Sequence, residues 1–271
     1  MQTVAGVGGS LLRARPAQVG EIEIPFPPLA EQRRIAAILD QADDLRRKRR
    51  EALNSLNSLI PALLARTLEA QSPTILSKTV QLESLVRDDD RINYGVVQPG
   101  AETEDGVALI RVESVVANDF RLHLLKKIDP NIEAQYKRSR LKGDEILVAC
   151  VGSIGAIAYA SPTQKGFNIA RAVARVPVDP TKADRTYVAE YLRTPKAQSY
   201  FRSEIRAVAQ PTLNIKQLCE TPLPVPPLAV QRTFAARVAE IDKLKVAHRA
   251  HLTHLDSLFA SLQHRAFRGE L

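Results

Sequence analysis

Two segments of this 271-residue chain spell almost the same eleven residues, far apart in the sequence. "IPFPPLAEQRR" occupies residues 24–34, and "LPVPPLAVQRT" occupies residues 223–233. Sliding the sequence on itself by 199 positions aligns these segments and keeps the register far beyond them, so that Leu56 meets Leu255. A repeat of this kind limits the possible folds to those that contain one structural unit twice.

Each copy of the repeat predicts an extended segment followed by a long helix. The prolines of residues 25–28 lack amide donors and fix an extended backbone, so each helix should begin after them. Apolar residues then recur at alternating steps of three and four, the heptad spacing of a coiled coil. Pro61 is expected to interrupt the first helix. We expect the helix interface and partner surface to consist of Ile35, Leu45, Leu56, Leu59 and Leu63 in the first helix and Ile241, Leu244, Leu255, Leu258 and Leu262 in the second.

Polar residues also fall on the predicted helix interface. Arg49 and His248 occupy equivalent positions of the repeat, where a polar pair would fix the helix register. The basic run at residues 46–50 is interpreted as a solvated face, with phosphate contact as the alternative. His248, His251 and His254 do not converge on one point of a helix, and no cysteine or carboxylate completes a ligand set, so no metal site is expected.

The segment between the two helices has a different character. Short apolar and β-branched runs alternate with glycine and aspartate, and a helical pattern follows them. The expected fold class is α+β, with one mixed α/β domain and two long helices that form an antiparallel coiled coil. The expected divisions are a tail of another such domain at 1–24, a helix at 25–71, the mixed domain at 72–222 and the second helix at 223–271.

Composition limits the function classes. The net charge of +8 and the pI of about 9.6 favour a polyanionic partner. No apolar run is long enough for a membrane span, and the N-terminal residues lack the apolar core of a secretory signal. Cys150 and Cys219 have no metal-ligand spacing, so we expect free thiols in the cytoplasm.

No catalytic motif is found. "GVGGS" and "VGSIG" do not match a dinucleotide fingerprint, no phosphate-binding GK[ST] is present, and no Ser/His/Asp set suggests itself. Residues Asp88–Asp90 are interpreted as an exposed turn, because no second carboxylate cluster accompanies them. The sequence therefore favours a binding protein over an enzyme.

Several motifs together resemble the specificity subunit of type I restriction-modification enzymes. They are "IPFPPLAEQRRIAAILDQADDL" and its second copy, "LKGDEILVACVGSIG", "QPTLNIKQL" and the terminal "AFRGEL". The resemblance implies that a target-recognition domain reads half of a split site in double-stranded DNA. It also implies that the two helices dock methyltransferase subunits and that a motor-nuclease subunit joins to cleave. Catalysis, and with it S-adenosylmethionine, ATP and magnesium, would belong to those partners.

One departure from the family pattern concerns residues 1–24. By the repeat register they correspond only to the end of a recognition domain, so most of a first recognition domain is absent from this sequence. Three interpretations follow: an inactive truncated subunit, a subunit that pairs with a second specificity chain, or a half-reader that forms a homodimer.

Candidate DNA-binding residues are polar or basic side chains expected on loops, since Arg and Lys bind guanine and phosphate and Asn and Gln bind adenine. They are Arg111, Ser114, Lys137, Arg138, Arg140, Ser153, Lys165, Asn168, Gln210, Thr212 and Asn214. The alternative hypothesis is a coiled-coil adaptor that scaffolds proteins and never touches DNA.

Overall fold

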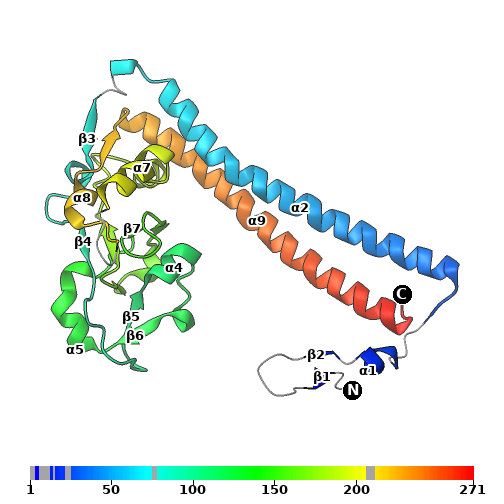
Figure 1. Cartoon of the computed structure of the whole chain (residues 1–271). Helices are drawn as coiled ribbons and strands as arrows, with labels where there is room; N and C mark the ends of the chain where they lie inside the picture. The colour runs from blue at the N-terminus through cyan, green and yellow to red at the C-terminus, as the bar shows by residue number, and fades with distance from the viewer. Residues whose placement is uncertain (1–3, 6–12, 15, 22–25, 75–77, 206–210) are drawn as a thin grey trace. The chain divides into compact units, whose positions relative to one another are not determined.

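In a computed structural model of the chain, the described residues are 4–5, 13–14, 16–21, 26–74, 78–205 and 211–271. The chain divides into two compact units: the first comprises residues 1–56 and 243–271, and the second comprises residues 57–242. Figure 1 labels many of the helices and strands of both units. The second unit takes in the adjoining ends of both long helices, so its limits differ from the domain limits expected at 72 and 222.

The duplication is preserved in the secondary structure. Helix α2 spans Leu29–Glu69 and helix α9 spans Leu228–Arg268, so both bounds recur 199 positions later. The short helices α1 (Pro16–Gly20) and α8 (Ile215–Cys219) are offset by the same number. Similar sequence therefore gives the same local structure in both copies, including where each helix begins and ends.

In the first unit, α2 and α9 lie antiparallel. Arg46 donates from Nε to Asp256 Oδ1 over 2.7 Å, and Arg34 donates to the Leu271 carbonyl over 2.5 Å. Lower numbers on α2 thus meet higher numbers on α9, which confirms the antiparallel pair of long helices. The unit also contains a two-stranded ribbon of β1 (Val4–Ala5) and β2 (Arg13–Ala14).

The prediction that Pro61 interrupts the first helix is wrong. Helix α2 is continuous across this position, although the proline removes one backbone hydrogen bond. Pro61 is exposed, whereas Ile60 and Leu64 are buried in the core of the second unit. Burial of one face therefore holds the helix together where local propensity disfavours it.

The second unit is the expected mixture of strands and short helices. Its strands are β3 (Thr79–Gln81), β4 (Asn93–Tyr94), β5 (Val107–Ile110), β6 (Lys126–Ile128), β7 (Ile146–Ala149), β8 (Ile157–Tyr159), β9 (Asn168–Ile169), β10 (Val173–Val176) and β11 (Pro222–Pro224). Its further helices are η1 (Leu82–Leu85), α4 (Val112–Ala117), η2 (Leu122–Leu124), α5 (Pro130–Glu133), η3 (Ala134–Ser139), η4 (Pro162–Gln164), α6 (Arg185–Leu192) and α7 (Pro195–Glu204).

These strands form three small sheets. The largest is antiparallel with the order β4-β10-β7-β8, a second pairs β11 with β3, and a third has the order β6-β5-β9. Only the pairing of β5 with β9 is parallel among these described sheets. The main core lies between the largest sheet and helix α6, and its largest buried side chains are Tyr187, Tyr191, Phe201 and Phe234.

A buried ionic network supports the largest sheet. The guanidinium of Arg175, on β10, bonds the carboxylates of Asp90 and Glu145. Glu145 also accepts from the amides of Lys142 and Gly143, at 2.7 and 2.9 Å. Because every buried charge here has partners, the network fixes the turn before β7 without leaving an unpaired ion.

One half of the predicted helix interface occupies inward positions. The residues spaced by seven are buried or half-buried in both helices: Ile35, Ala42, Arg49, Leu56 and Leu63 on α2, and Phe234, Ile241, His248, Leu255 and Leu262 on α9. The equivalent residues Arg49 and His248 bond each other over 3.2 Å. Arginine can only donate, so His248 Nδ1 accepts.

The other half of the predicted interface and partner surface does not face inward, because the inward positions lie one residue further along each helix. Leu45, Leu59, Leu244 and Leu258 are 48, 47, 51 and 48% exposed, and the following residues, Arg46, Ile60, Lys245 and Phe259, lie further inward. Arg46 covers the ring of Phe259 at 4.3 Å while its head group bonds Asp256. A search for apolar residues selects leucine and passes over basic residues. Long basic side chains can nevertheless take inward positions, because their aliphatic stems cover apolar surface.

Candidate nucleic-acid interface

Four loop segments of the second unit meet at one edge, which we call the loop edge: residues 96–98, 151–153, 170–172 and 211–213. Backbone bonds join them in sequence. The amide of Arg171 bonds the Val96 carbonyl over 2.8 Å, and the amide of Cys150 bonds the Ala172 carbonyl over 2.8 Å. A bridge between Val151 and Thr212 then adds the fourth segment.

Two residues that directly precede the 96–98 segment, Tyr94 and Gly95, fix the geometry of the loop edge. The hydroxyl of the half-buried Tyr94 donates to the Leu213 carbonyl over 2.5 Å, and partial burial raises the pKa of this hydroxyl. At Gly95 a Cβ atom would lie 1.6 Å from the Ile169 carbonyl oxygen. Only glycine therefore permits the approach that lets Val96 bond to Ile169.

The exposed side chains of the loop edge are suited to a nucleic acid. Gln98, Ser153 and Arg171 are exposed, and Val97 is 50% exposed. Arg171 forms no ion pair within the described part of the chain. A free guanidinium beside amide and hydroxyl groups offers the donors and acceptors that phosphates and base edges require.

The sequence analysis selected Ser153 and Thr212, which the structure brings to the loop edge, but it missed Arg171 and Gln98. Arg171 interrupts the apolar run "NIARAVARV" between β9 and β10. A charged residue between two buried strands is the signal that could have found it, because such a residue needs an exit to solvent.

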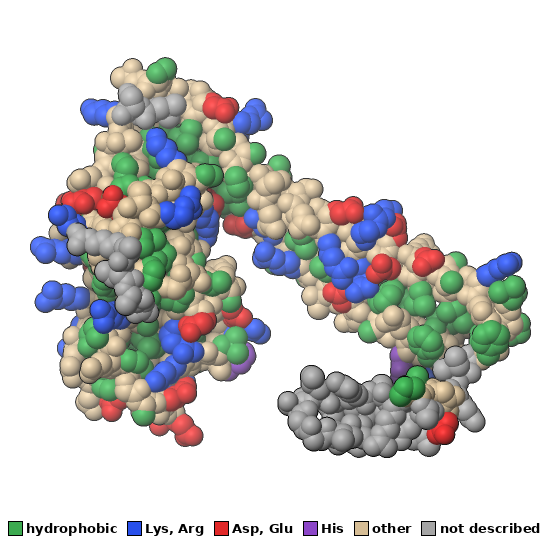
Figure 2. All heavy atoms as spheres, viewed as in Figure 1, with side chains coloured by type: hydrophobic (Ala, Val, Ile, Leu, Met, Phe, Trp, Pro, Cys, Tyr) green, Lys and Arg blue, Asp and Glu red, His purple; other side chains and the backbone are tan. Residues whose placement is uncertain are grey.

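A second group of basic residues lies on η3 and in the turn after η4, and we call it the basic ridge: Lys137, Arg138 and Lys165. All three side chains are exposed, and none forms an ion pair with another described residue. The carbonyl of Arg138 accepts from Asn93 over 3.0 Å, which ties η3 to β4. Figure 2 shows Lys and Arg side chains projecting from the sheet-containing unit.

Arg140 belongs to the same basic cluster in sequence, but it is engaged within the protein. Its guanidinium bonds both oxygens of Glu133, whose carboxylate is buried. The bonds from Arg140 are the main reason that the pKa of Glu133 lies below its usual value. Arg140 therefore holds η3 in place and has fewer donors for DNA than Lys137 or Arg138.

The prediction that Asn168 reads DNA is wrong. Its side chain is fully buried, donates to Glu133 Oε1 over 2.9 Å and to the Tyr136 carbonyl, and accepts from Ser139. With both ends of the amide satisfied, Asn168 orients the basic ridge from beneath it.

The remaining candidates occupy varied positions. Arg111 caps α4 and is exposed, with only a distant ion pair to Glu113 at 3.9 Å, whereas Ser114 lies inside α4 instead of on a loop. Asn214 is the N-cap of α8, and its amide bonds Gln217. Gln210 lies outside the described residues.

The acidic run at residues 88–90 is held by cations. Asp88 pairs with Lys182 over 2.6 Å, and Asp90 pairs with Arg175 and Lys142. Among the described residues no group of three or more His, Cys, Asp or Glu is placed to hold a metal. Both cysteines are free, and burial raises the pKa of Cys150 to about 12. No described helix has the length and hydropathy needed to cross a membrane.

Comparison with known proteins identifies relatives along nearly the whole chain. A family model described as "Type I restriction modification DNA specificity domain" matches residues 3–55 and 87–253. The type I restriction enzyme EcoBI specificity subunit of Escherichia coli is 32% identical over 92% of this chain and 58% of its own length. The StySPI specificity subunit of Salmonella potsdam is 24% identical over 97% of this chain and 61% of its own length. The chain thus spans about three fifths of these relatives.

Solved structures share the fold. A chain from a study of the complex assembly and conformational transition of the type I R-M system has a TM-score of 0.63 at 22% identity, covering 97% of this chain and 66% of that one. The HsdS subunit from Thermoanaerobacter tengcongensis has a TM-score of 0.53 at 23% identity, covering 98% of this chain and 65% of that one.

Proposed function

The chain belongs to the type I restriction-modification DNA specificity family, and from this membership we propose that its second unit reads one half of a two-part DNA site. The observation that carries the proposal is the loop edge, where separate segments present an unpaired Arg171 beside Gln98 and Ser153. The basic ridge supplies further unpaired cations. Together they provide phosphate contacts for affinity and base contacts for sequence choice.

An exchange of the second unit tests sequence reading. Residues 57–242 are replaced by the corresponding segment of the EcoBI specificity subunit, because junctions at these points keep Ile60, Leu64, Phe234 and Val238 within one core. Methylated sequences are mapped before and after the exchange. We expect the half-site to become that of the donor while binding to the methylation subunit is retained. An unchanged sequence would favour the adaptor alternative.

Single substitutions separate the two kinds of contact. Arg171→Ala and Lys137→Ala remove cations, so a phosphate role predicts weaker binding to every sequence and a salt slope lower by about 1. Ser153→Ala should relax choice at one base pair if the hydroxyl reads a base. Fluorescence anisotropy with matched and mismatched duplexes, over a range of salt concentrations, distinguishes these results. Lys216→Ala is the control, because Lys216 is exposed on α8 and pairs weakly with Glu220.

We also propose that α2 and α9 dock methylation subunits and that this chain is the non-catalytic member of the complex. The support is the set of half-exposed leucines, because Leu45 and Leu59 recur as Leu244 and Leu258. Exposed apolar side chains in regular positions favour a protein partner. Methyl transfer, DNA cleavage and their cofactors would belong to the partner subunits.

A two-part DNA site requires two recognition domains. In the described part of the chain one sheet-containing unit lies between the repeated helices. We therefore propose that an active complex includes a second recognition domain beside the one between these helices. Native mass measurement on a methylating complex is the test, and a complex with a single recognition domain contradicts the proposal.

A further inference from the structure

The repeat makes the centre of the helix pair in the first unit nearly symmetric. Arg49 and His248 are equivalent residues, and they bond each other across the pair. When equivalent positions of two antiparallel helices meet, a local twofold axis passes between them. Every surface feature near this point therefore has a counterpart on the other side of the axis.

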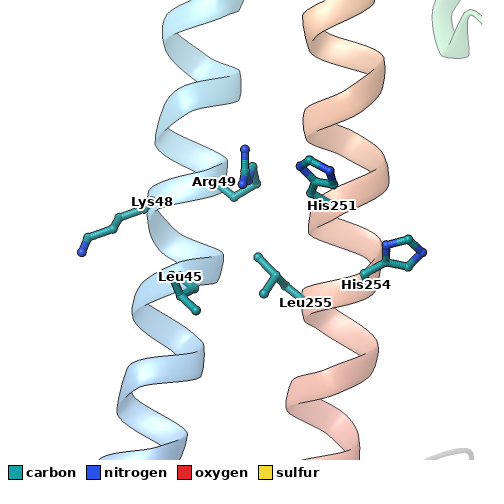
Figure 3. A pocket seen from close by; sticks show the side chains of 6 residues that line it. All are labelled: Leu45, Lys48, Arg49, His251, His254 and Leu255. Atoms are coloured by element: carbon teal, nitrogen blue, oxygen red, sulfur yellow. The ribbon is translucent and has the colours of Figure 1, made fainter.

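One such feature is an open groove of about 600 Å³ between the helices. Figure 3 shows Leu255 of α9 reaching toward α2, where Leu45 lies on the facing helix. Lys48 and Arg49 line the groove from α2, and His251 and His254 line it from α9. The groove thus combines an apolar floor with a rim of nitrogen donors.

The counterpart surface keeps the floor but loses the rim. In the repeat register, Leu244 and Leu56 replace the two leucines, and Leu244 is 51% exposed against 48% for Leu45. Lys48 is replaced by Ala247, His251 by Ala52 and His254 by Ser55, while Arg49 and His248 exchange places. The two sets of equivalent residues therefore differ in charge and in hydrogen-bonding capacity.

No carboxylate lines the groove, so its donors are available to a partner. Lys48 pairs with Asp44 over 2.8 Å, but its side chain is 65% exposed, and Asp44 also bonds Arg47. His251 and His254 are both exposed. Salt bridges of this exposed kind stabilise little and are readily exchanged for contacts with a partner.

We propose that this groove is the stronger of two docking sites for the methylation subunit, and that it binds a segment in which an apolar side chain is flanked by carboxylates. The proposal rests on the docking function proposed above. The apolar side chain would pack on Leu45 and Leu255, while the carboxylates accept from Lys48, His251 and His254. The counterpart surface would bind the same segment more weakly, because only the apolar contact remains. A protein fits better than DNA, since a phosphate backbone gains nothing from a leucine floor.

The duplication provides matched variants for the test. Lys48→Ala, His251→Ala and His254→Ser together remove from the groove the three donors that its counterpart lacks. Ala247→Lys with Ser55→His gives the counterpart surface two of the donors that line the groove. Arg249→Ala is the control, because it removes an exposed cation of α9 that does not line the groove. Helix content of all variants is compared by circular dichroism.

The experiment titrates the full chain with the methylation subunit purified from the same host and resolves one-copy and two-copy complexes by native mass spectrometry. We expect the dissociation constants of the two binding steps to differ by about tenfold or more at low salt and by less at high salt. The triple variant should weaken the first step by about tenfold and leave two equal sites. The reverse variant should tighten the second step, and the control should change neither.

The possible results separate the two proposals. Equal steps in the unchanged chain, or an unchanged separation in the triple variant, would overturn the unequal-groove inference and leave docking intact. Failure of the unchanged chain to bind any methylation subunit would overturn docking itself and the inference with it. If the triple variant lost DNA affinity while both steps stayed the same, the groove would be a DNA contact and the inference would be wrong.

Discussion

The same two helices are buried to different degrees in the two units. Within the second unit, Leu64 and Phe234 are 2% and 1% exposed and belong to a core shared with α6 and the largest sheet. Among the described residues of the first unit, only Ala42 and Lys245 are buried. The helices continue from one unit into the other, but their surroundings change from a packed core to a two-helix contact.

This difference shows what a pair of helices can and cannot bury by itself. Two helices cover one stripe on each other and leave the remaining faces in water, whereas a sheet and further helices surround a side chain completely. Ion pairs in the first unit are correspondingly exposed, and the second unit contains a buried network around Arg175. Partners that bind the first unit should therefore stabilise it.

The largest expected effect comes from Phe234→Ala. The ring is fully buried and meets Tyr187 edge to face, with centroids 6.2 Å apart. Its removal should lower the free energy of unfolding by about 3–5 kcal/mol. Phe267→Ala is the matched control on the same helix, because Phe267 is 69% exposed, and a change within about 0.5 kcal/mol is expected there. Urea unfolding measures both, and similar losses would contradict the contrast between the units.

A pair of neighbouring residues tests which side of α2 faces inward. Ile60 is buried and Leu59 is half-exposed. Ile60→Ala should cost about 2–5 kcal/mol, because it leaves a cavity in the core. Leu59→Ala should cost no more than about 1 kcal/mol, because much of the side chain is already in water. If Leu59→Ala cost more in urea unfolding, the heptad positions expected from sequence would be correct after all.

A smaller effect separates a structural polar residue from an exposed one. Asn168→Ala removes one buried hydrogen bond each from Glu133 and Ser139, so the unfolding free energy should fall by about 1–3 kcal/mol. Lys165→Ala should change stability by no more than about 0.5 kcal/mol and should weaken DNA binding at low salt. Both variants are measured by thermal unfolding and by anisotropy with duplex DNA. A stable Asn168→Ala variant with relaxed sequence choice would restore Asn168 as a base reader.

The smallest effect concerns acid stability of the second unit. Burial alone would raise the pKa of Asp90, but hydrogen bonds from Arg175 and Lys142 outweigh it and hold that pKa below the ordinary value of 3.8. A carboxylate with a lowered pKa in the folded state stabilises the fold above its unfolded pKa, and this contribution is lost as the pH falls.

Stability of the second unit should therefore decrease as the pH falls below about 4. Asp90→Asn should be less stable than the unchanged chain at pH 7, and it should lose less on acidification. Urea midpoints at neutral and acidic pH measure this difference. Equal losses on acidification in both proteins would show that Asp90 does not contribute to the acid sensitivity.

Candidate site residues were predicted with uneven success, and the reasons are physical. Ser153 lies between Gly152 and Gly155, which both have positive φ, in a tight turn whose local conformation exposes it. Asn168 has an equally loop-like sequence, "KGFN", but strand β9 carries it under η3, where Glu133 and Ser139 surround it. Exposure of a polar residue depends on segments distant in the chain, so its own neighbours in sequence do not reveal it.

The sequence by itself determined the duplication, the extent of both long helices and their equivalence at each end. Prolines that stop a helix from extending, and the helix propensity of the residues after them, are local properties of the sequence. The same local sequence therefore folds in the same way in both copies. Only the tertiary structure decided which series of residues faces inward, because Arg46 and Lys245 displace Leu45 and Leu244 from the inward positions. It also decided that Arg171 joins Ser153 and Thr212 at the loop edge, since backbone bonds between segments far apart in the chain create that surface.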